Sequence, residues 1–144
     1  MYETVVVGFD DSPHARSGLS RAIELARGLG ASVHVVTVVE STSSPMTFDI
    51  GDVGEINQAA EELVSQIVET VAVDGIEITG MVRRGKPHTE LMDYADEVDA
   101  DLLVVGQRGG DGLETALLGS TADRLARVSE IPVMIVPGND GADS

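Results

Sequence analysis

Continuously apolar segments alternate along the chain with amphipathic ones, and this pattern predicts strands and helices in turn. The segment 101–106 (Asp-Leu-Leu-Val-Val-Gly) is continuously apolar after its first residue, as in a strand buried on both faces. With four further segments of strand composition, the predicted strands are residues 4–9, 32–39, 76–82, 101–106 and 132–136. Apolar positions at helical spacing predict helices over residues 13–29, 53–73, 87–98 and 120–129.

Capping signals mark the ends of the first two helices. Ser12 is placed as an N-cap, Pro13 as the first helical residue and Gly30 as the residue that ends the helix. Asp52 and Glu55 have the spacing of a capping box for the second helix. The buried stripes of these helices are predicted at Leu19, Ile23, Ala26, Leu29, Ile56, Ala60, Leu63 and Ile67.

Repeated strand–helix alternation predicts an α/β fold, a single-domain open Rossmann-like sandwich with helices on both faces of a parallel sheet. The 144 residues suit one domain, which we place at residues 1–138, with a flexible C-terminal tail at 139–144. Residues 40–54 are rich in Ser, Thr, Pro and Gly and predict a long mobile loop.

Glycines follow the apolar strand at 101–106 in a pattern suited to binding phosphate. Gly106-Gln107-Arg108-Gly109 is separated by nine residues from Gly119-Ser120-Thr121, which opens a predicted helix. Glycines allow backbone amides to approach phosphate oxygens, and a helix start adds unpaired donors and the positive end of the dipole. Each residue alone fits a turn or an N-cap; together, after a buried strand, they indicate a nucleotide site.

Two charged residues extend this hypothesis. Arg108 lies inside the glycine loop and is suited to bidentate pairing with phosphate. Asp10 closes the first strand, where its carboxylate would accept hydrogen bonds from a ribose or base, help hold Mg2+, or cap the following helix. The adjacent Asp11 is interpreted as a surface charge.

The charge balance excludes some classes of partner. The chain has 25 acidic and 9 basic residues, a formal net charge of -16, and Lys86 is its only lysine. A field of this sign repels nucleic acid, and an acidic, lysine-poor surface resembles proteins of extreme halophiles such as haloarchaea. Cysteine is absent, which excludes disulfides and thiolate chemistry.

The remaining basic and imidazole groups offer weaker candidates. Arg83, Arg84 and Lys86 form a basic cluster at the end of the third predicted strand, and we favour pairing with carboxylates over steering of a nucleotide. A P-loop starting at Gly80 fails at Pro87, which lacks the hydroxyl for Mg2+. The three histidines have no metal-ligand spacing and no catalytic triad is evident; solvated roles are expected for His14 and His88 and a structural one for His34.

From residue 5 to residue 137 the chain resembles the universal stress protein family, in its ATP-binding subgroup. Three motifs carry the resemblance: the Gly106-x2-Gly109-x9-Gly119-Ser120 signature, the opening Val-Gly-Phe-Asp-Asp-Ser-Pro-His-Ala at 7–15, and Gly-Lys-Pro-His at 85–88. The resemblance implies a five-stranded sheet in order 3-2-1-4-5, four helices and a homodimer formed through the strand at 132–137. Asp11 stands where the family usually has a small residue.

The resemblance also implies how a nucleotide is held. It places Gly8 and Asp10 near the base and ribose and Val38 against adenine. The positions matching the ribose and triphosphate contacts are Gly106, Gly109, Gly119, Ser120 and Thr121. The implied ligand is ATP, with Mg2+ bound through the phosphates.

We therefore expect a cytoplasmic, homodimeric stress-response protein whose partner affinity or loop order depends on bound ATP. No window approaches the ~20 apolar residues of a membrane span, and the N-terminus lacks a signal peptide's basic start. One alternative is a slow ATPase, or a protein that phosphorylates itself on Ser120 or Thr121. Another is a nucleotide-free, chaperone-like scaffold, which the glycine signature disfavours. The protein partner is unknown.

Overall fold

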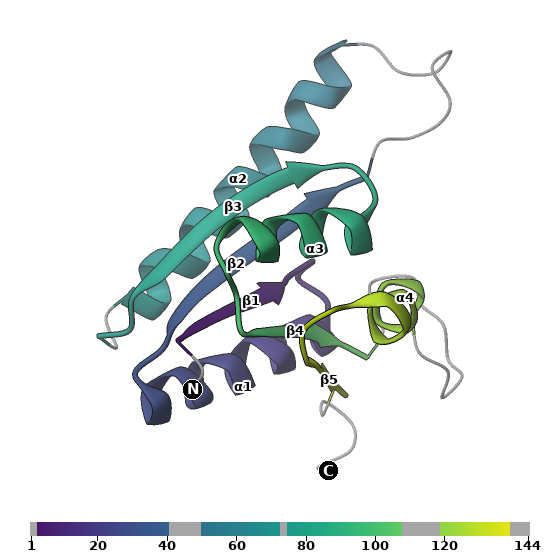
Figure 1. The fold of residues 1–144 in the computed structure, drawn as a ribbon. Helices are drawn as coiled ribbons and strands as arrows, with labels where there is room; N and C mark the ends of the chain where they lie inside the picture. Colours follow the sequence, from purple (N-terminus) through teal and green to yellow (C-terminus); the bar gives the residue numbers. More distant parts are fainter. Residues whose placement is uncertain (1–2, 41–49, 73–74, 108–118, 139–144) are drawn as a thin grey trace.

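The computed structural model describes residues 3–40, 50–72, 75–107 and 119–138 (Figure 1). Strands and helices alternate along the chain, as the sequence predicted. They are β1 (Thr4–Gly8), α1 (Pro13–Leu29), β2 (Ser32–Val39), α2 (Ile50–Ala72), β3 (Ile78–Arg84), α3 (Pro87–Glu97), β4 (Leu102–Gly106), α4 (Ser120–Val128) and β5 (Val133–Val136).

The five strands form one parallel sheet in the order β3-β2-β1-β4-β5. Val7 is the register partner of Val35 on one side and of Val104 on the other, so β1 lies at the centre of the sheet. The strand order reverses at β1, and the crevice beside the carboxyl ends of β1 and β4 is the position where such sheets bind ligands. The predicted fold class and strand order are confirmed.

Helices cover both faces of the sheet: α1 and α2 lie on one face, and α3 and α4 on the other (Figure 1). Side chains of β1 and β4 alternate between the two cores, which explains why residues 5–7 of β1 and 102–105 of β4 are continuously apolar. Val5 and Val7 pack with α1, whereas Val6 and Leu103 pack with α3 and α4. All four side chains are fully buried.

The second helix starts earlier than predicted. It begins at Ile50, so Asp52 and Glu55 lie inside α2 and the predicted capping box is wrong. Gly51 and Gly54 suggested a loop, but a glycine in a helix costs only about 1 kcal/mol relative to alanine and does not forbid the helix. Of the predicted mobile loop at 40–54, residues 41–49 lie outside the described residues.

Two smaller predictions are also corrected. The third strand is Ile78–Arg84 and not 76–82, because it pairs in parallel with β2 from Val33↔Ile78 to Val39↔Arg84. Leu29, predicted in the buried stripe of α1, is 41% exposed, because it occupies the last turn before the left-handed C-cap Gly30. The stripe residues Leu19 and Ala26 are buried as predicted.

Within the part of the chain that the structure describes, no helix has the length and apolar content needed to cross a membrane.

Candidate functional site

A cavity of about 200 Å³ opens at the carboxyl ends of β1, β2 and β4, between the first turns of α3 and α4. Seven of the nine predicted site residues line it: Gly8, Asp10, Val38, Gly106, Gly119, Ser120 and Thr121. The other two, Arg108 and Gly109, lie outside the described residues. The structure thus brings together residues from four separate segments of the sequence.

The start of α4 gives the cavity a set of backbone donors. The first helical hydrogen bond runs from the Asp123 amide to the Gly119 carbonyl at 2.9 Å, so the amides of Ser120, Thr121 and Ala122 precede the hydrogen-bonded ladder. The N-cap, Gly119, has no side chain with which to cap them. All three residues line the cavity, where unpaired donors and the helix dipole favour an anion.

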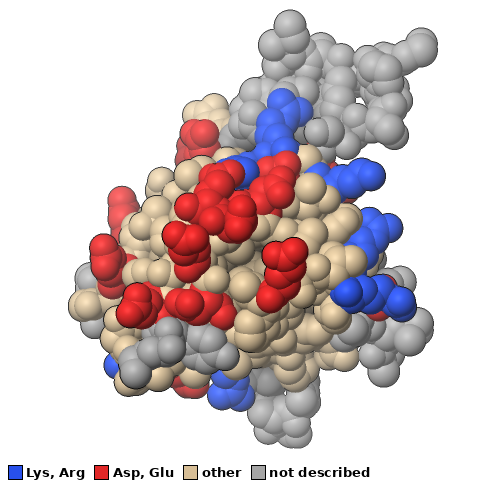
Figure 2. Space-filling view, viewed as in Figure 1, with Lys and Arg blue, Asp and Glu red and all other residues tan. Residues whose placement is uncertain are grey.

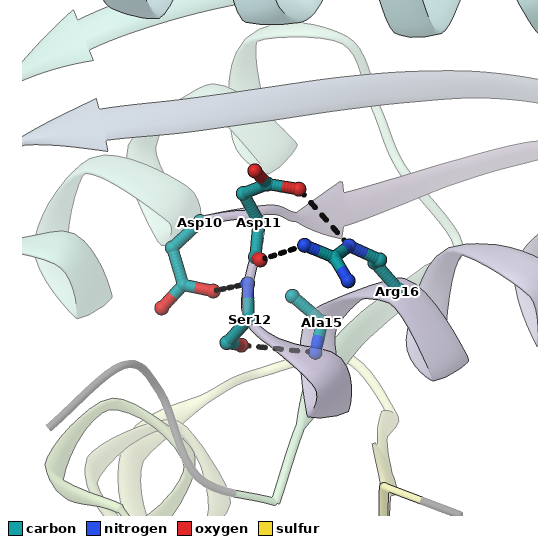
Figure 3. A network of polar contacts seen from close by, with 5 residues as sticks. All are labelled: Asp10, Asp11, Ser12, Ala15 and Arg16. Atoms are coloured by element: carbon teal, nitrogen blue, oxygen red, sulfur yellow. Dashed lines mark hydrogen bonds and ion pairs between the residues drawn. The ribbon is translucent and has the colours of Figure 1, made fainter. Parts of the chain in front are cut away.

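The turn between β1 and α1 positions the carboxylate of Asp10 (Figure 3). Its Oδ1 accepts a hydrogen bond from the Ser12 amide at 3.0 Å, and Ser12 Oγ accepts one from the Ala15 amide at 3.1 Å. Ser12 is therefore the helix N-cap, as predicted, while Asp10 fixes the turn before it. Asp10 also lines the cavity, where a carboxylate can accept hydrogen bonds from hydroxyl groups of a ligand.

Asp11 adopts a left-handed backbone with φ of 64°. Arg16 holds this turn, because its Nε donates to Asp11 Oδ1 at 3.0 Å and its Nη2 donates to the Asp11 carbonyl at 2.9 Å (Figure 3). The carboxylate is exposed and ion-paired, which agrees with the predicted surface charge. Aspartate tolerates this conformation better than most residues, so the departure from the usual small residue is accommodated locally.

Gly106 and Gly138 both pack against His14, a residue predicted to be solvated. His14 is instead half-buried, and its Nδ1 accepts a hydrogen bond from the Gly138 amide at 2.8 Å. The segment after β5 folds back over the first turn of α1, and this contact is why His14 is half-buried and not solvated. A Cβ on Gly106 would lie 2.7 Å from the His14 carbonyl carbon, so close packing alone requires glycine there.

An apolar slot faces the donors of α4. Val36, Leu91 and Val105 are buried, and Val38 is half-buried. These side chains line the cavity together with Pro87 and offer the flat contact that a nucleobase needs.

Sequence reasoning missed several lining residues: Phe9, Ala15, Val36, Glu40, Pro87, Leu91, Val105 and Ala122. For two of them, the position in the sequence could have indicated a place at the cavity. Glu40 directly follows β2 at the ligand edge of the sheet, and Leu91 lies one helical turn after Pro87.

In the basic cluster at the end of β3, one arginine is ion-paired and the other two residues are exposed. Arg83 pairs with Glu90 at 3.1 Å and with Glu97 at 2.8 Å, and its guanidinium lies 5.5 Å from the centre of the Tyr94 ring. The hydrogen bonds that Arg83 donates to Glu97 and Glu90 raise the pKa of its guanidinium above its usual range. The predicted pairing with carboxylates is confirmed for Arg83, whereas Arg84 and Lys86 are exposed.

His34 has the structural role that was predicted. Its Nδ1 shares a hydrogen bond with the Tyr94 hydroxyl at 2.8 Å, joining β2 to α3 beneath the helix. Burial lowers the pKa of His34, and the nearby charge of Glu77 partly opposes this shift.

A larger cavity, of about 530 Å³, lies at the opposite end of the sheet between the last turns of α3 and α4. Four carboxylates line it: Asp93, Asp96, Asp99 and Glu130. A phosphate would be repelled there, so size alone does not make it the better nucleotide site. Among the described residues, no group of three or more His, Asp or Glu is arranged to hold a metal ion.

Comparisons with known proteins agree with this geometry. Residues 1–137 match the model of the universal stress protein family. The chain is 28% identical to the universal stress protein MJ0531 of Methanocaldococcus jannaschii, over 94% of this chain and 82% of that protein.

Two similar solved structures contain nucleotides. One is a universal stress protein in complex with cAMP, at 30% identity and a TM-score of 0.74, with 95% of this chain and 98% of that chain covered. The other is the universal stress protein of Archaeoglobus fulgidus in complex with dAMP, at 30% identity and a TM-score of 0.69, with 94% and 98% covered.

Proposed function

Since the chain belongs to the universal stress protein family, we propose that its cavity binds an adenine nucleotide and that the protein is a nucleotide-dependent regulator of a stress response. The proposed ligand is ATP, with Mg2+ held through the phosphates, and the proposed compartment is the cytoplasm. The observation that carries the proposal is the juxtaposition of the α4 start, the apolar slot and the Asp10 carboxylate around one cavity.

Each part of the cavity suits one part of the nucleotide. The base fits the slot lined by Val38 and Leu91, and the Asp10 carboxylate accepts hydrogen bonds from ribose hydroxyls. The phosphate oxygens accept hydrogen bonds from the backbone amides at the start of α4, beside Gly106. Arg108 and Gly109 are proposed to complete this phosphate contact.

The ligands of the two similar structures support this assignment. The chemistry that cAMP and dAMP share is an adenine, a sugar and one phosphate. Preference for ATP over a monophosphate is therefore the part of the proposal that rests on the glycine signature of this chain.

We further propose a homodimer formed through residues 132–137. β5 is an edge strand paired on one side with β4, and Val133, Met134 and Ile135 are half-exposed. Edge strands of this kind pair readily with a second copy. A monomeric mass in analytical ultracentrifugation would contradict this assembly.

The acidic surface supports function in concentrated salt. Acidic side chains are spread over much of the face in Figure 2, so the folded state repels itself at low ionic strength. We expect stability to rise from about 0.15 M to about 1 M KCl, where the Debye length falls from about 8 to about 3 Å. Unfolding curves that are independent of KCl would argue against a halophilic origin.

Ser120→Asp tests the nucleotide site directly. Ser120 is the exposed first residue of α4, where an aspartate suits the helix dipole and leaves the fold intact. Its charge would occupy the place proposed for phosphate. We expect ATP affinity to fall at least about ten-fold, with adenosine affinity changed by less than about two-fold.

Ser20→Asp is the matched control, because Ser20 is an exposed serine of α1 outside the cavity lining. It adds the same charge and should bind ATP like the wild type. The proposal fails if the folded wild-type protein does not bind ATP in calorimetric titration, or if Ser120→Asp binds it normally.

A further inference from the structure

Basic and acidic side chains are segregated on the face that carries α3 and α4. Figure 2 shows several basic side chains along its right-hand edge, on the side where β3 ends and where α3 and α4 begin, while acidic side chains lie mainly in the upper centre and on the left. In a chain with a net charge of -16, a basic edge beside the candidate nucleotide cavity requires an explanation.

Two cationic side chains and one imidazole come from residues next to the cavity lining, at the starts of α3 and α4. Lys86 is the N-cap of α3, and His88 is the second residue of that helix, next to the lining residue Pro87. Arg124 lies one turn along α4 from Ser120 and Thr121, and helical side chains tilt toward the N-terminus, which brings Arg124 over those two lining residues. We call Lys86, His88 and Arg124 the basic rim.

His88 lies within the electrostatic influence of the other two rim residues. Burial lowers the pKa of His88, and the positive charges of Arg124 and Lys86 lower it further. Among the described residues, neither Lys86 nor Arg124 forms an ion pair with a carboxylate, whereas Arg83 and Arg127 on the same face do. The rim thus carries two positive charges, on Lys86 and Arg124, that have no carboxylate partner among the described residues and that an anion would compensate.

The other charged groups around His88 do not supply that anion. Glu90, two residues further along α3, accepts a hydrogen bond from Arg83 at 3.1 Å. Asp123 on α4 pairs with Arg127 at 3.1 Å. Glu40 follows β2 and Asp10 follows β1, and both line the cavity at the carboxyl ends of these strands.

We propose that the basic rim is an anion subsite that holds a terminal phosphate of the bound nucleotide, beyond the phosphate taken by the start of α4. This inference rests on the proposed function and adds three residues outside the glycine signature to those that select ATP over AMP. Carboxylates on the strand side and cations on the helix side orient the nucleotide, with its ribose toward Asp10 and its outer phosphates toward the rim.

Arg124→Gln and Lys86→Gln test the subsite. Each removes a charge-assisted contact, so we expect ATP affinity to fall about ten-fold, with AMP and adenosine affinities changed by less than about two-fold. Arg127→Gln removes the same charge from the exposed end of α4 and should leave all three affinities unchanged. The differences should shrink between about 0.15 M and about 1 M KCl because salt screens exposed charges.

His88 supplies an independent readout. A phosphate beside it raises the pKa of the imidazole, so ATP binding should take up protons near neutral pH and AMP binding should not. Calorimetry in buffers of different ionisation enthalpy measures this uptake. His88→Gln should abolish it.

The outcomes separate the two proposals. A folded wild-type protein that binds neither AMP nor ATP overturns both. Wild-type ATP affinity in Arg124→Gln and Lys86→Gln, with ATP still bound by the parent, overturns the subsite alone. If inorganic phosphate binds the ATP-saturated protein and Arg124→Gln loses that binding, the rim holds a separate anion and the subsite as proposed is wrong.

Discussion

Gly106, at the end of β4, lies directly against His14 in the first turn of α1. A Cβ on Gly106 would stand 2.7 Å from both the carbonyl carbon and the Cβ of His14, and 2.9 Å from the Ala15 nitrogen. Two of these three atoms belong to the backbone, so a rotamer change cannot relieve the contact. The same glycine lines the cavity and therefore serves both the packing of α1 and access for a ligand.

Gly106→Ala is predicted to destabilise the protein by about 2 kcal/mol, because α1 would have to move away from β4. Gly28→Ala is its control. Gly28 is an exposed residue of α1, and a methyl group added to it would have no neighbouring atom within 4 Å, so alanine there should stabilise the helix by up to about 1 kcal/mol. Urea unfolding measures both changes, and equal stability of the two variants would contradict the packing argument.

Asp11 provides a prediction about backbone strain. Its φ of 64° is accessible to glycine and strained for a β-branched residue. Asp11→Gly should stay within about 1 kcal/mol of the wild type, because relief of strain offsets the loss of an exposed ion pair with Arg16. Asp11→Val should cost about 1–2 kcal/mol. Thermal unfolding that ranks valine above glycine would refute the left-handed assignment.

His34 provides a prediction about pH. Burial lowers its pKa in the folded state, so below about pH 6.5 the unfolded chain binds a proton that the folded chain does not. This contribution to stability is present above about pH 6.5 and is lost as the pH falls toward the folded-state pKa.

His34→Gln keeps a polar partner for the Tyr94 hydroxyl but does not titrate. The stability advantage of the wild type over this variant should therefore shrink between about pH 7.5 and about pH 5.5. Comparing the two proteins cancels the change in carboxylate repulsion over the same range. Parallel pH profiles would show that His34 is not protected from protonation in the fold.

Tertiary packing explains both the predictions that succeeded and those that did not. The parallel sheet was predictable because the centres of β1 and β4 are buried on both faces and so carry only apolar side chains. The start of α2 was not predictable, because Gly51 and Gly54 lower the helix propensity of this segment without abolishing it. The contact of His14 with Gly138 joins residues 124 positions apart, and no local pattern signals it.

The candidate site also contains residues that local sequence spacing predicted and residues that only tertiary packing brings to the cavity. The glycine signature predicted the residues around the start of α4 because their spacing is local. Leu91 lines the same cavity because α3 packs over β1 and β2, whereas Glu40 does so because β2 ends at that edge of the sheet. The basic rim likewise depends on the approach of α3 to α4, which brings residues 88 and 124 into electrostatic contact.

The most direct test of the central claim is to map ATP binding by amide chemical shifts of the 144-residue protein in the presence of Mg2+. We predict saturable shifts that are largest at Gly8, Ser120 and Thr121, around the cavity between the helix starts. The account is contradicted if saturating ATP leaves these amides unmoved, or if the shifts gather instead around Asp99 and Ile131 in the opposite cavity.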